Sequence, residues 1–461
     1  MIKTFARFLR SSRLAVGFVA LLTSVGATRS EAQGMGEEVQ INVWTTNSQK
    51  SPSVDGAPNG EFVVAWSSYL QDPDCNIYGS YTCDVLIARR VSATGGPIEG
   101  EIRVSSASET SSNAAVARNA DGDFVVAWNG WSHPLFGLNV YARRFDPEGN
   151  AVGPGFPISS AAYRLDNREP AVDRAPSGEF VVVWEQYYHF FEWGVYGRRF
   201  DATGAPLGEL FAVRPIGWPR QGQPDVAMGE SGSFVVVWFE QTPQESFRVS
   251  ARRYDEAGLP LDDGFQVNEG GGMFGVTQIS MDDSGGFVIA WDRRNAGDEW
   301  EIAARRFDAD GLPLGPEFQV NSYTTGLQRN AAVGVDGTGR FLVVWQSESQ
   351  DGSDLGIFAQ AFDADGERIG SELRVNAWTT GAQRFPSVAA AGSDRFLVAW
   401  QSEAQDGSSS GIFARVVELP LFADGFESGD TSGWSCTGGD GCPDGGPASS
   451  RLAPIHSADS S

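Results

Sequence analysis

The sequence has few of the residues on which most catalytic and metal sites depend. Its 461 residues include three histidines and four cysteines. The sequence predicts neither a nucleophile elbow, in which a strand-to-helix turn exposes a serine, nor the ligand spacing of a zinc site. His133 and His189 occur near acidic residues, and a histidine beside Glu185 could act as a general base. These three residues are the catalytic candidates, but the sequence favours a protein without catalytic activity.

Positive charge is also scarce. The 34 lysine and arginine residues are outnumbered by 59 aspartate and glutamate residues, which gives a formal net charge of −25. Nucleic acids and anionic membrane surfaces bind through lysine and arginine, so both are excluded as main partners. We expect neither a cofactor nor a metal, with calcium at the Asp-Gly turns as the alternative.

Long apolar segments are missing from most of the chain. One apolar run, Leu14–Leu22, is shorter than the roughly 20 residues that span a bilayer. Basic residues precede it and small residues follow it, as in a secretory signal peptide with cleavage after Ala27 or Ala32. A membrane anchor is the alternative. We expect a secreted protein at the cell surface, in the medium or in the periplasm, without a transmembrane segment.

The four cysteines form two close pairs, Cys75 with Cys83 and Cys436 with Cys442. In an oxidising compartment each pair can close a local disulfide loop. Neither pair has the two-residue spacing of a zinc knuckle. We predict two disulfides, with free thiols as the alternative.

What the sequence does contain is one unit repeated seven times. Each unit has an aromatic–aliphatic block that ends in tryptophan, and successive tryptophans lie 53 to 62 residues apart. The blocks are Phe62–Trp66, Phe124–Trp128, Phe180–Trp184, Phe234–Trp238, Phe287–Trp291, Phe341–Trp345 and Phe396–Trp400. A period of this length with β character indicates a β-propeller in which each repeat forms one sheet.

Each unit contains four strand candidates. In the sixth unit they are Ala331–Val335, Phe341–Trp345, Ile357–Phe362 and Glu372–Asn376. The tryptophan blocks are apolar at every position, as expected for a strand buried on both faces between neighbouring sheets. Tight turns of the Asp-Gly type precede the block and follow the third strand, whereas the other connections vary. One face of the propeller should therefore be uniform, and the other should carry the sequence variety and the function.

The chain also indicates how the ring closes. Glu37–Gln49 is similar to the fourth-strand segment Arg374–Gln383 but precedes the first complete unit, and the last unit ends at Ile412–Val417 without a fourth strand. We predict that the N-terminal strand completes the seventh blade, with an open array as the alternative. The predicted domains are a signal peptide (1–32), an all-β seven-bladed propeller of four-stranded antiparallel blades (33–417), and a C-terminal segment with a disordered tail (418–461).

Arginine pairs recur in the third strands of five units, as in Arg89–Arg90. Repeats reuse their interface contacts, so we predict that one arginine per unit pairs with an acidic turn residue or with a neighbouring blade. Anion binding is the alternative.

The variable connections are rich in aromatic residues. Tyrosine and tryptophan combine a flat apolar face with a hydrogen-bonding tip, which suits glycans and peptides. The predicted ligand-binding residues are Tyr78, Tyr81, Trp131, Tyr187, Tyr188, His189, Trp193, Trp218 and Trp378, and the same face should also carry Trp44, Tyr163 and Tyr323. The alternative is that these rings pack on one another and cap the propeller.

Two segments resemble known proteins. Units such as Phe341–Gly366, followed by EFQVN-type strands, resemble those of a class of secreted bacterial repeat proteins. This resemblance extends from Ile41 to about Val417 and implies a secreted propeller without an assigned activity. The stretch FESGDTSGW (426–434) resembles a C-terminal segment of exported bacterial proteins and the opening strand of carbohydrate-binding jelly-roll modules. Too few residues follow for such a module, so a sorting tag and a plain tail both stay open.

These observations favour a secreted or cell-surface monomer that binds a glycan or a protein through its aromatic loops. One alternative is a secreted hydrolase or lyase that acts on polysaccharide, with His189 or His133 as the base. The other is a structural or adhesive surface protein.

The first loop gives a direct test of the disulfide prediction. Mass mapping of the non-reduced protein should recover one peptide pair linked through Cys75 and Cys83. Free thiols at both positions would contradict the prediction that this loop is pre-organised.

Overall fold

The computed structural model describes residues 34–69, 71, 84–105, 110–131, 137–159, 165–188, 192–217, 220–241, 247–270, 274–295 and 297–420. Of the two compact units of the chain, Met1–Ala32 and Gln33–Ser461, these residues belong to the second. Strands are their only regular secondary structure. Within these residues no helix is long and apolar enough to cross a membrane.

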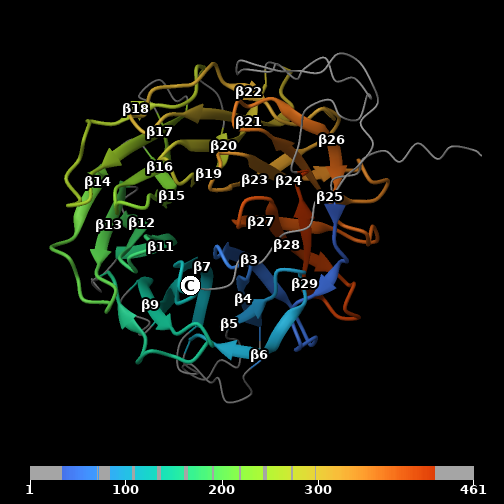
Figure 1. Cartoon of the computed structure of the whole chain (residues 1–461), viewed down its shortest axis with the longest axis horizontal. Helices are drawn as coiled ribbons and strands as arrows, with labels where there is room; N and C mark the ends of the chain where they lie inside the picture. Colours follow the sequence, from blue (N-terminus) through green and yellow to red (C-terminus); the bar gives the residue numbers. More distant parts are fainter. Residues whose placement is uncertain are drawn as a thin grey trace, which may run out of the picture. The chain divides into compact units, whose positions relative to one another are not determined.

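The described strands form seven antiparallel sheets around a common centre (Figure 1). We call each sheet a blade and number the blades along the chain from β3. The innermost strands are β3 (Gln49–Gly56), β7 (Thr110–Arg118), β11 (Leu165–Arg174), β15 (Gln221–Met228), β19 (Phe274–Met281), β23 (Gln328–Val335) and β27 (Gln383–Ala391). The second strands are β4 (Phe62–Tyr69), β8 (Phe124–Trp131), β12 (Phe180–Tyr188), β16 (Phe234–Gln241), β20 (Phe287–Arg294), β24 (Phe341–Glu348) and β28 (Arg395–Glu403).

The outer half of each blade is less regular. The third strands are β5 (Asp84–Val91), β9 (Asn139–Phe145), β13 (Glu192–Phe200), β17 (Phe247–Tyr254), β21 (Trp300–Phe307), β25 (Leu355–Phe362) and β29 (Ser410–Glu418). The outermost strands are β6 (Pro97–Arg103), β10 (Phe156–Pro157), β14 (Phe211–Gly217), β18 (Phe265–Gln266), β22 (Phe318–Gln319) and β26 (Arg368–Arg374), with β1 (Gly34–Met35) and β2 (Val39–Gln40) in blade 7. This arrangement confirms the predicted seven-bladed propeller.

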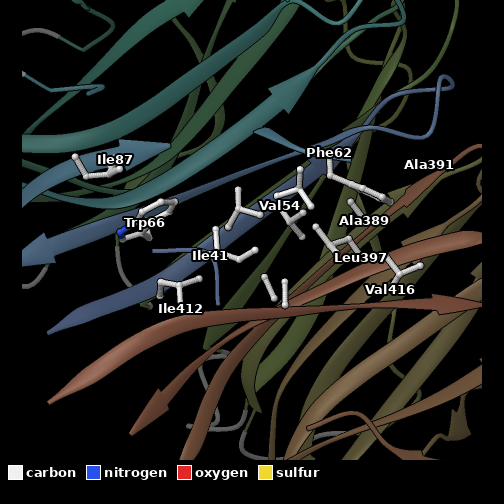
Figure 2. Packing of buried hydrophobic residues seen from close by; sticks show 14 of the residues in the cluster. Ile41, Val54, Phe62, Trp66, Ile87, Ala389, Ala391, Leu397, Ile412 and Val416 are labelled. Atoms are coloured by element: carbon white, nitrogen blue, oxygen red, sulfur yellow. The ribbon is translucent and has the colours of Figure 1, made fainter. Parts of the chain in front are cut away.

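Burial of the second strands holds neighbouring blades together. The tryptophan of each second strand packs against the preceding blade, as Trp66 of blade 1 does in one cluster with Leu397 and Val416 of blade 7. Figure 2 shows these side chains interleaved between the two sheets. Phe62 and Trp66 are both fully buried. The block is apolar at every position because both of its faces meet another sheet.

The N-terminal strands close the ring. β1 and β2 both pair antiparallel with β29, in the registers Gly34↔Glu418 and Val39↔Ala414. Closure by the N-terminal strand was predicted, but as one continuous segment from Glu37 to Gln49. The pairing ends just beyond Ile41, whose N–H donates to Ile412 O at 2.8 Å. After it, Asn42 accepts the Ile412 N–H with its side chain, which replaces the backbone partner.

Asparagine side chains end two of the predicted outer strands in the same way, by taking the place of a backbone acceptor. The segment Glu317–Asn321 forms only the two-residue β22, and Glu372–Asn376 ends early within β26. Asn321 and Asn376 close each ladder by accepting a third-strand N–H, at 2.8 and 2.7 Å, through their side-chain oxygens.

Arginine side chains form a second repeated interface contact. In each blade one arginine donates to a backbone carbonyl of the preceding blade, as Arg143 does to Val104 O at 3.0 Å. Among the described residues these donors are Arg89, Arg143, Arg198, Arg252, Arg305, Arg368 and Arg415. The predicted contact with a neighbouring blade is therefore confirmed, although these partners are carbonyls and not acidic side chains. A carbonyl suits the repeat because every blade has one at the same place.

Replacing Ile41 with alanine tests the closure. Ile41 is fully buried between blades 7 and 1, so Ile41→Ala should lower the free energy of unfolding by about 2–4 kcal/mol. Denaturant titration measures this change. The matched control is Val43→Ala, two residues further on and 60% exposed, which should change stability by less than about 0.5 kcal/mol. Equal effects of the two substitutions would contradict a closing role for this segment.

Candidate functional site

The two faces of the ring differ in their connections. On the lower face, tight turns join the inner to the second strand and the third to the outer strand in blades 1 to 6. Examples are the Gly122 N–H to Asn119 O bond at 3.1 Å and the Gly149 N–H to Asp146 O bond at 3.0 Å. Both glycines have φ near +90°, which favours glycine. Those of the remaining connections that the structure describes in full, such as 322–327 and 377–382, lie on the opposite, upper face, as the predicted difference between the faces requires.

Aspartates of the lower-face turns stabilise the turns themselves. The Asp201 carboxylate, for example, accepts hydrogen bonds from the backbone N–H groups of Thr203 and Ala205 at 2.8 and 2.9 Å. Across the described ranges, no group of three or more histidine, cysteine, aspartate or glutamate residues is arranged to hold a metal ion.

A cavity of about 870 Å³ lies at the centre of the ring and is lined by all seven inner strands. Each inner strand is an edge strand of its sheet. The backbone N–H groups on its unpaired side therefore need hydrogen-bond acceptors from outside the sheet. Short side chains of the preceding blade supply them. Asp55 accepts the Arg118 N–H at 2.6 Å, and Asp173 accepts the Met228 N–H at 2.6 Å. Asp225 accepts the Ile279 N–H at 2.9 Å, so the polar groups of the cavity wall serve the architecture.

The cavity walls change the acidity of these aspartates. Burial raises the pKa of Asp55 to about 6 and that of Asp225 to about 7. Burial also raises the pKa of Asp173 well above its usual range, and the nearby Asp55 adds to the effect. Folding therefore favours the protonated form of all three carboxyl groups.

Glu185 follows the repeat tryptophan of blade 3 and occupies a structural position. Its carboxylate accepts the Gln223 N–H of blade 4 at 3.3 Å. The equivalent residues of blades 5 and 6 make the same contact with the next blade: Asp292 accepts Asn330 N–H at 2.9 Å and Gln346 accepts Phe385 N–H at 3.2 Å. Burial raises the pKa of Glu185 to about 7, the hydrogen bond from Gln223 opposes this rise, and the nearby Glu169 charge adds to it. The other two catalytic candidates, His133 and His189, lie outside the described residues.

Two of the predicted binding residues come together on the upper face. Tyr187 of β12 and Trp193 of β13 are cross-strand partners whose ring centroids are 4.4 Å apart. Arg168 lies over the Tyr187 ring at 5.5 Å, and Arg220 lies over the Trp193 ring at 4.8 Å. Arg220 also lies 5.6 Å from the ring of Phe239 in blade 4. We call these five residues the aromatic band.

The other predicted residues are dispersed. Trp131 ends β8 in blade 2 and is 45% exposed, whereas Trp378 lies between β26 of blade 6 and β27 of blade 7 and is 42% exposed. Tyr188 is the neighbour of Tyr187 and is half-buried. Tyr78, Tyr81, Trp218 and the cysteines at 75, 83, 436 and 442 lie outside the described residues.

Sequence reasoning did not identify three members of the band. Arg168, Arg220 and Phe239 carry no motif of their own. When the repeats are aligned on their tryptophans, Phe239 occupies the position that Glu185 has in blade 3, so an aromatic residue stands where another repeat has a polar one. That both arginines lie over aromatic rings depends on contacts between strands, and no local pattern encodes it.

The raised pKa values give a test by pH. As pH rises from about 4 to 7, the unfolded chain loses the protons of Asp55, Asp225 and Glu185 before the folded state does, because their pKa values are about 6, 7 and 7 in the folded state. Stability should therefore fall as pH rises through this window, by at least about 1 kcal/mol. Asp225→Asn keeps an acceptor for the Ile279 N–H and should flatten the dependence. Thermal unfolding of both proteins at pH 5 to 8 measures it, and parallel curves would contradict the assignment.

No protein-family model matches the sequence, and no curated protein matches it. The chain is similar to solved structures at low identity. One is a protein of unknown function from Dyadobacter fermentans DSM 18053, with 16% identity, a TM-score of 0.49 and coverage of 84% of this chain and 99% of that chain. Another is the polysaccharide lyase Uly1, with 8% identity, a TM-score of 0.49 and coverage of 86% and 96%. A third is the Hadza microbial sialidase Hz136, with 11% identity, a TM-score of 0.45 and coverage of 73% and 74%. Similarities this low assign no activity or ligand to the chain.

Proposed function

We propose that this protein is a non-catalytic, secreted or cell-surface propeller that recognises a glycan through the aromatic residues of its upper face. One observation carries the proposal. The exposed tryptophans among the described residues, Trp44, Trp131 and Trp378, all lie on the upper face and are 37%, 45% and 42% exposed. The turns of the lower face expose leucines instead, such as Leu259 and Leu312. Indole rings suit a sugar, because they pair a flat apolar face with a hydrogen-bond donor.

The aromatic band, in blades 3 and 4, adds polar groups for recognition on the same face. Tyr187 and Trp193 stand on paired strands, so their backbone positions are fixed before a ligand arrives. The exposed Arg220 offers guanidinium donors to ligand oxygen atoms from its position over Trp193. Rigid rings next to exposed donors are features of a recognition surface.

One observation favours a second function, hydrolysis or cleavage of a polysaccharide. Burial raises the pKa of Glu185 to about 7, so this carboxyl group retains its proton at slightly acidic pH and could donate it. Against this role, Glu185 is only 5% exposed and bonds to blade 4 as its counterparts in other blades do. Binding without turnover is therefore the first proposal.

A glycan-array screen followed by titration calorimetry tests the proposal. Trp193→Ala should weaken binding of the selected glycan about tenfold or more, because an aromatic anchor contributes about 2 kcal/mol. The control Leu259→Ala removes a 63% exposed side chain from the lower face and should leave the affinity unchanged. Sugar products released by the wild-type protein would instead favour the enzyme. Absence of binding to any glycan would contradict the proposal.

A further inference from the structure

Three connections of the upper face share a short sequence. Each runs from an outer strand to the next inner strand and contains an aromatic residue followed by two threonines: Trp44–Thr46, Tyr323–Thr325 and Trp378–Thr380. Each aromatic residue stands two positions after a buried asparagine, namely Asn42, Asn321 or Asn376. We call these three segments the threonine platforms. They occupy three consecutive junctions, between blades 5 and 6, 6 and 7, and 7 and 1.

The asparagines fix all three platforms in the same way. The side-chain amide of Asn42 donates to Trp44 O at 2.9 Å. The equivalent bonds from Asn321 to Tyr323 O and from Asn376 to Trp378 O are both 2.8 Å long. The side-chain oxygen of each asparagine also accepts an N–H of the third strand. Each asparagine side chain therefore links the backbone of the aromatic residue to a strand of its blade.

A glutamate of the following blade makes a second shared contact. Glu101 accepts the Val43 N–H at 2.6 Å, and Glu38 accepts the Ala377 N–H at 2.5 Å. Glu372 accepts the Ser322 N–H, the equivalent contact at the third platform. A glutamine donates to each of these carboxylates: Gln71 to Glu101, Gln405 to Glu38 and Gln350 to Glu372. Every platform is thus held by two neighbouring blades. Because the three junctions are consecutive, each platform is related to the next by a rotation of one blade around the ring.

The platforms present aromatic faces next to hydroxyl groups. Trp44 and Trp378 are 37% and 42% exposed, and Tyr323 is half-buried. The Trp378 indole N–H donates to Thr380 O at 2.7 Å, which orients the ring. The hydroxyl-bearing residues Thr45, Thr46, Thr324, Thr325 and Thr380 are exposed. An apolar face beside hydroxyl groups matches the surface of a neutral sugar.

We infer that the threonine platforms are three equivalent subsites for one linear, neutral polysaccharide that lies along the arc from blade 5 to blade 1. This inference rests on the proposed function and names its ligand class. A ligand that contacts three equivalent, evenly stepped sites must itself repeat, which favours a polymer of like units. The net charge of −25 and the carboxylates Asp351 and Asp406, near Asn376 and Asn42, oppose a polyanionic chain. Linked subsites raise affinity by multivalency without any new contact.

Chain-length dependence separates this site from the aromatic band. Purified wild-type protein and a Trp44→Ala/Trp378→Ala variant are titrated with short and long neutral oligosaccharides of glucose, mannose and xylose. For the wild type, affinity should rise by about 10² from the short to the long members of the preferred series. The variant should lose most of that gain while its thermal unfolding stays unchanged. Oligogalacturonates of the same lengths, which carry a carboxylate on each unit, should bind weakly.

The matched control is Val43→Ala, which removes an exposed side chain beside Trp44 without touching a ring. Length-dependent binding that survives in the double variant would overturn the inference. Tighter binding of the oligogalacturonates than of the neutral series would overturn the assignment of a neutral ligand. If the long oligosaccharides bind and only Trp193→Ala weakens them, the platforms are not subsites while the proposed function stands. If the wild type binds no glycan at all, the proposed function itself fails. Binding of a repetitive peptide in place of every sugar would overturn the assignment to a polysaccharide.

Discussion

Burial of the second strand on both of its faces is the interaction on which the other features depend. A strand such as Phe341–Trp345, apolar at every position and fully buried, is stable only with a sheet on either side. Each blade therefore needs two neighbours, and a row of blades would leave two apolar faces in water. Closing the row into a ring removes both ends. The short strands β1 and β2 achieve this by pairing with β29, and Ile41 fills the last interface.

Polar contacts that recur between the strands and blades support this arrangement. Arginines such as Arg143 bond to carbonyls of the preceding blade, aspartates such as Asp225 satisfy edge N–H groups around the cavity, and asparagines such as Asn376 end the outer strands. These contacts recur from blade to blade because the geometry recurs. A buried carboxyl group with a raised pKa is thus, in this ring, first a structural group. Glu185 shows this well, since Asp292 and Gln346 perform the same task in other blades.

The proposed recognition function depends on residues that the repeat does not require. On the upper face these are the exposed tryptophans, the aromatic band of blades 3 and 4, and the threonine platforms between blades 5 and 1. The two aromatic sets differ in physical character. The rings of the band lie against arginine side chains, which leaves guanidinium donors for recognition, whereas the platforms expose aromatic rings beside hydroxyl groups. A rigid scaffold that holds both before ligand arrival reduces the entropy lost on binding.

The sequence by itself determined the number of blades, the order of their strands, the tight turns of the lower face and the strand that closes the ring. These features are local and repeated, so a single pattern such as Phe-Val-Val-Ala-Trp or Asp-Gly states them many times. Only the tertiary structure decided that Arg143 bonds to a carbonyl, that the pKa of Asp225 rises to about 7, and that Arg220 lies over Trp193. It also decided where the outer strands end, because asparagine side chains replace their backbone partners. Such properties depend on groups brought together from different strands, often of different blades, and no single strand contains both partners.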